Sequence, residues 1–276
     1  MVNQIEAQDI ASSFSKAARS YDDAAFFQRI AADRLLERLE YFKLHPQSIL
    51  DIGSGTGYCS RELKKRYPQA KVTGIDIAQG MIEFSRQQSN QEEYLCADAL
   101  SLPLVSNSAD LIFSNLTIQW IEQLDELFKE FHRVLKPDGL LLFTSLGPDT
   151  LHELKQSWQA IDDYKHVNDF MDMHHLGDAM LNAAMLDPVV DNEPVVIGYN
   201  KAIELMRDLK NIGAHNIDKQ RKPGLTSPRA LKQLEQEYQK FAMQNGELPA
   251  TYELIYGHAF AREEIPLEYH QYGIEL

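Results

Sequence analysis

An acidic residue and three glycines stand at alternate positions in the segment Asp51-Ile52-Gly53-Ser54-Gly55-Thr56-Gly57. The apolar run 49–52 predicts a buried strand, and residues 58–67 predict a helix. Glycine can adopt positive φ and has no Cβ, so the backbone of such a turn can approach a ligand closely. The spacing therefore predicts a ligand-binding corner between a strand and a helix.

The glycine spacing distinguishes between classes of ligand. A dinucleotide fingerprint needs glycine at its first, third and sixth positions, and the sixth position counted from Gly53 is Tyr58. A phosphate-binding loop would need Gly-Lys-Ser or Gly-Lys-Thr, and neither tripeptide occurs in the chain. The pattern Asp51-x-Gly53-x-Gly55-x-Gly57 instead resembles the first motif of class I S-adenosylmethionine-dependent methyltransferases. The alternative is a glycine-rich turn that binds nothing, and the residues that follow make it less favoured.

Two further carboxylates follow predicted strands. Asp76 ends the predicted strand 71–76, at about the interval after Asp51 at which an acidic residue binds ribose hydroxyls in a βαβ unit. Its carboxylate could accept two hydrogen bonds from a diol and would favour a cationic ligand. The alternative for Asp76 is a cap of the predicted helix 79–88, and both roles can coexist. For Asp98, at the end of the predicted strand 93–100, the methyltransferase resemblance implies contact with the adenine amino group, and the alternative is a turn-forming aspartate.

Length and charge limit the class of protein. The chain has 276 residues, 44% hydrophobic residues and a formal net charge of −14. These values fit one large α/β domain, or one domain with an insertion, around a sizeable core. The negative charge argues against general binding to nucleic acid or to anionic membranes. Because no signal peptide and no membrane-spanning run is evident, we expect a cytoplasmic protein.

The cysteines and histidines lack the spacing of disulfide frameworks and metal sites. Cys59 and Cys96 form no CxxC pair, which favours a reducing compartment. His166, His174 and His175 form neither an HxxxH nor an HExxH motif and have no companion cysteine pair. We therefore expect no metal.

Alternating strands and helices predict an α/β fold with a doubly wound, mostly parallel seven-stranded sheet of the Rossmann-like type. The last four strands are expected at 109–116, 140–145, 187–199 and 251–260, and Lys136-Pro137-Asp138-Gly139 is expected to end a helix. Asp191 and Pro194 are expected to interrupt the sixth strand. The predicted units are an N-terminal helical lid at 1–47, a cofactor-binding core at 48–199, a helical insertion at 200–248, and the final strand and tail at 249–276.

Two segments outside the core could contact a substrate. In the lid, Tyr21 and Gln28 could face the cofactor while Lys16 and Arg19 meet an anionic substrate. A helix pair that only covers the sheet is the alternative, and composition alone favours it. The insertion is locally basic, which predicts either a docking surface for an acidic macromolecule or a solvated helix face. Its basic residues are Lys201, Arg207, Lys210, Lys219, Arg221, Lys222 and Arg229.

Nearly the whole chain resembles the malonyl-[acyl-carrier protein] O-methyltransferases of biotin synthesis. Apart from the glycine motif, the resemblance rests on the segments FSKAARSYDDAAFFQR, SLGPDTLHELKQSW, HVNDFMDMHHLGDAML, DPVVD, MRDLKNIGAHN and LPATYELIYGHAF. These segments also resemble a group of mitochondrial respiratory-complex assembly factors, in which a similar fold is linked to arginine hydroxylation. The chain departs from the family at Ala183-Ala184-Met185-Leu186, where an Ala-Gly-Phe helix end is expected, and at His175, where relatives often carry an acid.

The resemblance implies S-adenosylmethionine as cofactor, S-adenosylhomocysteine as product, and a malonyl thioester on acyl-carrier protein as substrate. The malonyl carboxylate would attack the methyl group without a base, because it is already ionised near about pH 7. An arginine or lysine is expected to hold that carboxylate. We expect no nucleic-acid or membrane partner. The alternatives are an assembly factor or protein-arginine-modifying relative of the same fold, and a methyltransferase of a free small carboxylic acid.

The expected site residues fall into two groups. Cofactor contacts are expected from Tyr21, Gln28, Asp51, Gly53, Ser54, Gly55, Gly57, Asp76, Ile77, Met81, Asp98, Ala99, Asn115 and Leu116. Substrate positioning is expected from Tyr21, Gln119, Trp120, Arg133, Arg207 and Arg221.

Overall fold

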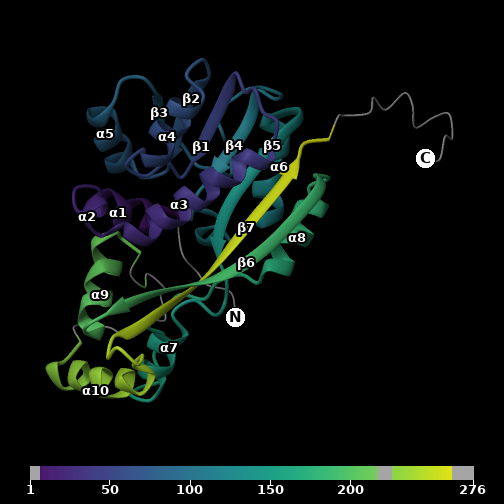
Figure 1. The fold of residues 1–276 in the computed structure, drawn as a ribbon. Helices are drawn as coiled ribbons and strands as arrows, with labels where there is room; N and C mark the ends of the chain where they lie inside the picture. Colours follow the sequence, from purple (N-terminus) through teal and green to yellow (C-terminus); the bar gives the residue numbers. More distant parts are fainter. Residues whose placement is uncertain (1–6, 215, 217–225, 263–276) are drawn as a thin grey trace.

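The computed structural model describes residues 7–214, 216 and 226–262. Within these residues seven strands form one sheet in the order β3-β2-β1-β4-β5-β7-β6 (Figure 1). Strands β1 to β5 are parallel, and β7 runs antiparallel to both β5 and β6. The strands are β1 (Ser48–Ile52), β2 (Lys71–Asp76), β3 (Glu93–Cys96), β4 (Ala109–Ser114), β5 (Leu135–Leu146), β6 (Leu186–Tyr199) and β7 (Leu248–Phe260). The prediction of a doubly wound, mostly parallel seven-stranded sheet is confirmed.

Side chains of the central strands alternate between two apolar layers, because successive residues of a strand point to opposite faces. In β1, Ile49 packs in the layer that contains residues of α3 (Phe26–Arg38) and α4 (Tyr58–Arg66). Leu50 packs in the layer that contains residues of α6 (Leu124–Val134) and α8 (Met173–Asn182). Helices thus cover both faces of the sheet, which explains why the central strand β4 is mostly apolar and almost entirely buried.

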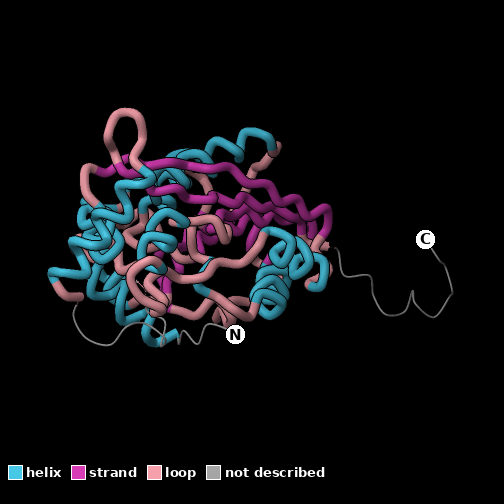
Figure 2. The backbone as a smooth tube through the Cα atoms, turned by 90° about the horizontal axis from the view of Figure 1, so that it is seen from below, coloured by secondary structure: helices cyan, strands magenta, loops and turns pink. Residues whose placement is uncertain are grey.

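The remaining helices lie around the ends of the sheet. Helix α1 (Ala7–Ala17) packs on α5 (Gln79–Gln88), and α2 (Tyr21–Ala24) packs on α9 (Ala202–Asn211). Helices α7 (His152–Gln159), α9 and α10 (Pro228–Tyr238) gather at one end of the long β6–β7 pair (Figure 1). Figure 2 shows the strands together as one layer, with helices along its flanks. The short 3-10 turns are η1 (Leu39–Tyr41), η2 (Ile118–Trp120) and η3 (Gln239–Phe241). No helix in the described parts of the chain combines the length and the apolarity needed to cross a membrane.

Two strands differ from their predicted course. Strand β5 begins at Leu135, because Leu135 pairs with Ala109; the predicted turn residues 136–139 then form a bulge before regular pairing resumes at Leu140. Strand β6 runs through Asp191 and Pro194 without a break, so the predicted interruption is wrong. β6 is an edge strand, where a proline need not donate a ladder hydrogen bond.

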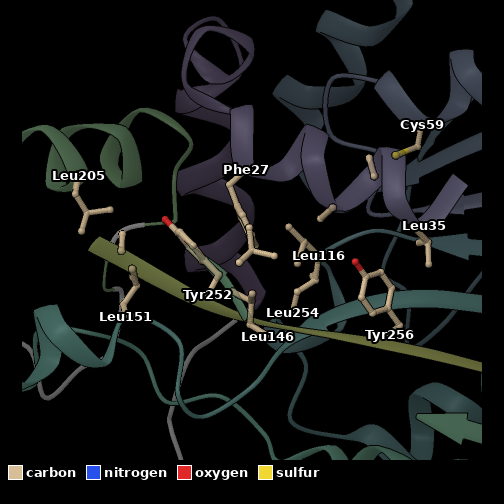
Figure 3. Close-up of a cluster of buried hydrophobic side chains, with 14 of the residues drawn as sticks. Phe27, Leu35, Cys59, Leu116, Leu146, Leu151, Leu205, Tyr252, Leu254 and Tyr256 are labelled. Carbon is tan, nitrogen blue, oxygen red and sulfur yellow. The ribbon is translucent and has the colours of Figure 1, made fainter. Parts of the chain in front are cut away.

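The larger apolar cluster joins the N-terminal helices, the sheet and the helices between β6 and β7 (Figure 3). Phe27 of α3 stacks on Tyr252 of β7 with ring centroids 3.9 Å apart. Leu205 of α9 belongs to the same cluster. Tyr238 of α10 is 1% exposed, and its hydroxyl donates a hydrogen bond of 2.8 Å to the Pro249 carbonyl at the start of β7. The predicted insertion is therefore anchored to the sheet by both packing and a buried hydrogen bond.

We expect Tyr238→Phe to lower the free energy of unfolding by about 0.5–1.5 kcal/mol, because the buried Pro249 carbonyl loses its donor. Tyr41→Phe is the matched control and should change nothing, since Tyr41 is 83% exposed. Urea unfolding of the two variants measures the difference. An equal midpoint for both would show that this hydrogen bond does not couple α10 to the sheet.

Candidate functional site

The glycine corner lies at the carboxyl end of β1, as predicted. Gly53, Gly55 and Gly57 have φ values of +72°, +54° and +81°, a region that favours glycine. A Cβ on Gly53 would lie 1.9 Å from Thr117 Oγ1, whereas a Cβ on Gly55 would meet no atom within 4 Å. Packing therefore excludes a side chain at Gly53, and the backbone of Gly55 is open to a ligand.

Asp76, at the end of β2, holds this corner in place. Its Oδ2 accepts a hydrogen bond of 2.9 Å from the Gly55 amide, and its Oδ1 accepts one of 2.8 Å from the Ala78 amide. Burial raises the pKa of Asp76, and the two hydrogen bonds oppose that rise. Each carboxylate oxygen keeps a lone pair for a further donor. Ala78, and not Asp76, occupies the N-cap position of helix α5, which has no side-chain cap hydrogen bond, so Asp76 is not the predicted N-cap residue.

Asp51 stabilises the corner through a buried contact between β1 and α4. It is 1% exposed within β1, and its Oδ2 accepts a hydrogen bond of 2.6 Å from the Ser60 hydroxyl of α4. Burial raises the pKa of Asp51 to about 7, and the hydrogen bond from Ser60 opposes this rise. From α5, the Ser85 hydroxyl donates a hydrogen bond of 2.8 Å to the Gly55 carbonyl. Helices α4 and α5 thus hold the corner from two sides.

A cavity of about 390 Å³ opens against the corner, within the usual size range of small-molecule sites. Three acidic residues, Asp76, Asp98 and Glu122, are part of its wall, so the cavity suits a ligand that carries positive charge. Most of the predicted cofactor residues line it. These are Tyr21, Gly53, Gly55, Asp76, Ile77, Met81, Asp98, Ala99, Asn115 and Leu116, together with Trp120 from the predicted substrate group.

Three other predicted cofactor residues are not among those that line this cavity. Gln28 and Ser54 line a smaller pocket next to the corner. Gly57 is the N-cap residue of α4, and a Cβ there would lie 2.5 Å from the Tyr94 hydroxyl. Gly57 therefore serves the turn and its packing.

Part of the cavity wall was not predicted from the sequence. Ile10 and Phe14 line the cavity from α1. Their spacing of four residues places both on one face of a helix and could have indicated a shared contact surface. Thr117 and Glu122 line it from the segment around η2. No pattern in the sequence marked these two residues, because their positions depend on how β4 connects to α6.

A smaller chamber of about 60 Å³ adjoins the cavity. Phe14, Tyr21, Leu116 and Trp120 line both spaces and form the junction between them. At this junction the rings of Phe14 and Trp120 meet edge-on, with centroids 5.4 Å apart. The other polar residues of the chamber wall are Gln28, Gln119, Thr150, His166, Asn168 and Asn216.

The predicted substrate cations are not among the residues that line these spaces. The Arg133 guanidinium binds Glu130 at 2.7 Å and donates to the carbonyls of Leu102 and Leu104. Arg133 therefore holds the segment before β4 instead of a substrate. Arg207 is exposed on α9, and Arg221 lies outside the described residues.

The fold is similar to that of solved methyltransferase structures. The phosphoethanolamine N-methyltransferase 2 of Haemonchus contortus, solved in complex with S-adenosyl-L-methionine, superimposes with a TM-score of 0.57 over 90% of this chain and 57% of that chain, at 18% identity. A family model described as a methyltransferase domain matches residues 50–143. That match covers the part of the chain from β1 to β5, which contains the glycine corner.

Two curated relatives match over nearly the whole length. The malonyl-[acyl-carrier protein] O-methyltransferase of Gallionella capsiferriformans is 44% identical over 93% of this chain and 91% of its own length. The protein of the same name from Laribacter hongkongensis is 45% identical over 91% of this chain and 88% of its own length. The chain therefore belongs to the malonyl-[acyl-carrier protein] O-methyltransferase family.

Proposed function

We propose that this chain transfers the methyl group of S-adenosylmethionine to the free carboxylate of a malonyl thioester on acyl-carrier protein. The product would be the methyl ester that enters biotin synthesis. The observation that carries the proposal is the acid-lined cavity at the glycine corner, in a chain whose full-length relatives are named for this reaction. The cytoplasmic location stays a prediction from the sequence.

The cavity wall fits S-adenosylmethionine, which supplies a methyl group on a positively charged sulfur when bound. Asp76 retains a lone pair on each oxygen and would accept the two ribose hydroxyls. Asp98 accepts a hydrogen bond from the Leu100 amide on Oδ1, which leaves Oδ2 for the adenine amino group. Gly55 would let the methionine part approach the backbone, since no side chain covers it.

The residues at the junction would orient the substrate and exclude water, and no residue has to remove a proton. A malonyl carboxylate is already ionised near about pH 7. Burial raises the pKa of the Tyr21 hydroxyl, so Tyr21 stays protonated and can donate a hydrogen bond to a carboxylate oxygen. Phe14 and Trp120 close the junction with apolar surface, which favours a near-attack arrangement without competing water.

Purified protein incubated with S-adenosylmethionine and malonyl-carrier protein is expected to add one methyl group to the carrier, because a free carboxylate is the proposed nucleophile. Intact-mass spectrometry of the carrier measures the gain. Acetyl-carrier protein, which has no free carboxylate, is the matched control and should not change. Bound S-adenosylmethionine without methyl transfer would instead favour the assembly-factor alternative.

Asp76→Ala is expected to weaken binding of S-adenosylhomocysteine by about tenfold or more, because the ribose loses its acceptor and the Gly55 amide loses its partner. Asp23→Ala is the control, since Asp23 is an exposed carboxylate of α2 that does not line the cavity. Calorimetric titration measures both affinities. Unchanged affinity in Asp76→Ala would remove the ribose assignment.

A second part of the proposal concerns docking of the carrier. Arg207 and Lys210 are exposed on α9, and Lys16 and Arg19 are exposed at the end of α1. The two helix ends are joined by the Ser20 hydroxyl, which donates a hydrogen bond of 2.9 Å to the Asn211 carbonyl. These cations could attract an acidic carrier protein although the net charge of the chain is negative.

We expect the double variant Arg207→Glu with Lys210→Glu to lower kcat/KM for malonyl-carrier protein by about tenfold, because docking loses its charge complementarity. The value for malonyl-pantetheine should stay within about twofold of the wild type, since this small thioester needs no docking surface. The control is Lys43→Glu with Lys129→Glu, two exposed lysines that lie on neither α1 nor α9. Equal losses on both substrates would contradict docking at α9.

A further inference from the structure

The two spaces that meet at Tyr21 differ in charge. The larger cavity has Asp76, Asp98 and Glu122 in its wall. The described residues that line the smaller chamber include no aspartate, glutamate, lysine or arginine. Like charges repel strongly in a site of low dielectric constant. An anionic group is therefore disfavoured in the cavity. In the chamber, no negatively charged side chain of the described wall repels it.

The chamber wall contains buried amides with unused hydrogen-bonding capacity. Asn168 Oδ1, Gln119 Oε1 and Gln28 Oε1 have no hydrogen-bond partner in the described structure, and all three residues line the chamber. Asn168 is 7% exposed. A buried polar group without a partner costs free energy, which a ligand that binds it would recover.

These amides differ in what they can offer. Gln119 Nε2 already donates a hydrogen bond of 2.7 Å to the Leu116 carbonyl, so Gln119 presents its oxygen to the chamber. Asn168 Oδ1 has no hydrogen-bond partner in the described structure, and rotation of the amide by half a turn would place the NH₂ group at that position instead. Asn168 can therefore act as a neutral donor to an anion.

The segment that carries Asn168 is held firmly against the core. The ring of His166 stacks on Trp158 with centroids 3.9 Å apart, and His166 Nε2 lies 2.8 Å from Asp162 Oδ1. Val167, between His166 and Asn168, is buried in the larger apolar cluster. The two residues that precede Asn168 are therefore fixed by packing.

The size of the chamber matches a small head group. Its volume of about 60 Å³ corresponds to roughly four or five water-sized atoms. The terminal carboxymethyl part of a malonyl thioester has about that size.

We propose that this chamber binds the carboxylate end of the malonyl group and that Asn168 is the neutral hydrogen-bond donor that positions it. The proposal rests on the proposed function and names the substrate contact of the same site. It differs from the expectation that an arginine or lysine holds the carboxylate. A neutral donor orients the anion without the strong ion pair that would reduce its nucleophilicity.

The test compares malonyl-pantetheine with its methyl ester, which lacks the negative charge and carries one additional methyl group, by calorimetric titration in the presence of S-adenosylhomocysteine. Asn168→Asp replaces the amide by a nearly isosteric carboxyl group, which would oppose a bound carboxylate. At mildly alkaline pH we expect malonyl-pantetheine to bind about tenfold or more weakly to N168D, and the methyl ester to bind within about threefold of the wild type. Asn200→Asp, at an exposed asparagine between β6 and α9, should alter neither affinity.

Retained binding of the methyl ester shows that N168D is folded at this site, and Gln119→Glu provides a second variant with the same expected selectivity. Equal loss or no loss for the two ligands in both variants would overturn the assignment of the chamber. A third variant, Arg221→Ala, tests a cation as the partner. If Arg221→Ala loses binding of malonyl-pantetheine while N168D binds it as the wild type does, the carboxylate is held by a cation instead. If the wild type binds malonyl-pantetheine but fails to methylate malonyl-carrier protein, the proposed function fails while the chamber assignment stands.

Discussion

The hydrogen bond between the Gly55 amide and Asp76 is the contact on which the site depends. A turn with three residues at positive φ has no repeating hydrogen-bond ladder of its own, so its polar groups need outside partners. Asp76 holds the Gly55 amide and Ser85 holds the Gly55 carbonyl. Gly55, whose backbone is open to the cavity, is thus fixed through both its amide and its carbonyl group by residues of β2 and α5.

The helices that cover this corner are tied to the rest of the chain on two sides. A Cβ on Gly80 of α5 would lie 2.6 Å from the Ser15 carbonyl of α1, so α1 and α5 approach closely at a glycine. On its other side, the Ser13 hydroxyl of α1 donates a hydrogen bond of 2.9 Å to the Gly213 carbonyl, just beyond α9. The chamber wall takes residues from the N-terminal helices, the core and the segment after α9. The predicted division at 47 and 200 therefore stays a prediction about sequence segments, since residues from all of these segments line one chamber.

Local sequence patterns predicted the strands and the glycine corner, because each of these depends on residues close together in the chain. Together with the family resemblance they predicted half of the residues that line the cavity. The spacing of glycines and the alternation of strands with helices were sufficient for the sheet and for Asp76 at its edge. Arg133 shows where such reasoning stops: nothing in its neighbourhood in the sequence indicates that it binds the Leu102 and Leu104 carbonyls. Pro194 could not be placed either, because only the strand order shows that β6 is at an edge. Asn168 was unassigned for the same reason, since the chamber exists only after six distant segments have packed.

The separation of charge between the two spaces bears directly on the chemistry. Methyl transfer from a sulfonium to a carboxylate neutralises both charges, so a site that stabilises each reactant by a strong ion pair would stabilise the ground state more than the transition state. The carboxyl groups of Asp76, Asp98 and Glu122 line the cavity, whereas the rings of Phe14 and Trp120 at the junction are apolar. On the substrate side the described wall offers amides, hydroxyls and an imidazole, which can orient a carboxylate through hydrogen bonds weaker than those of an arginine. The positive charge nearest to the bound carboxylate would then be the sulfur that carries the methyl group. This arrangement attracts the carboxylate toward the methyl carbon that it attacks.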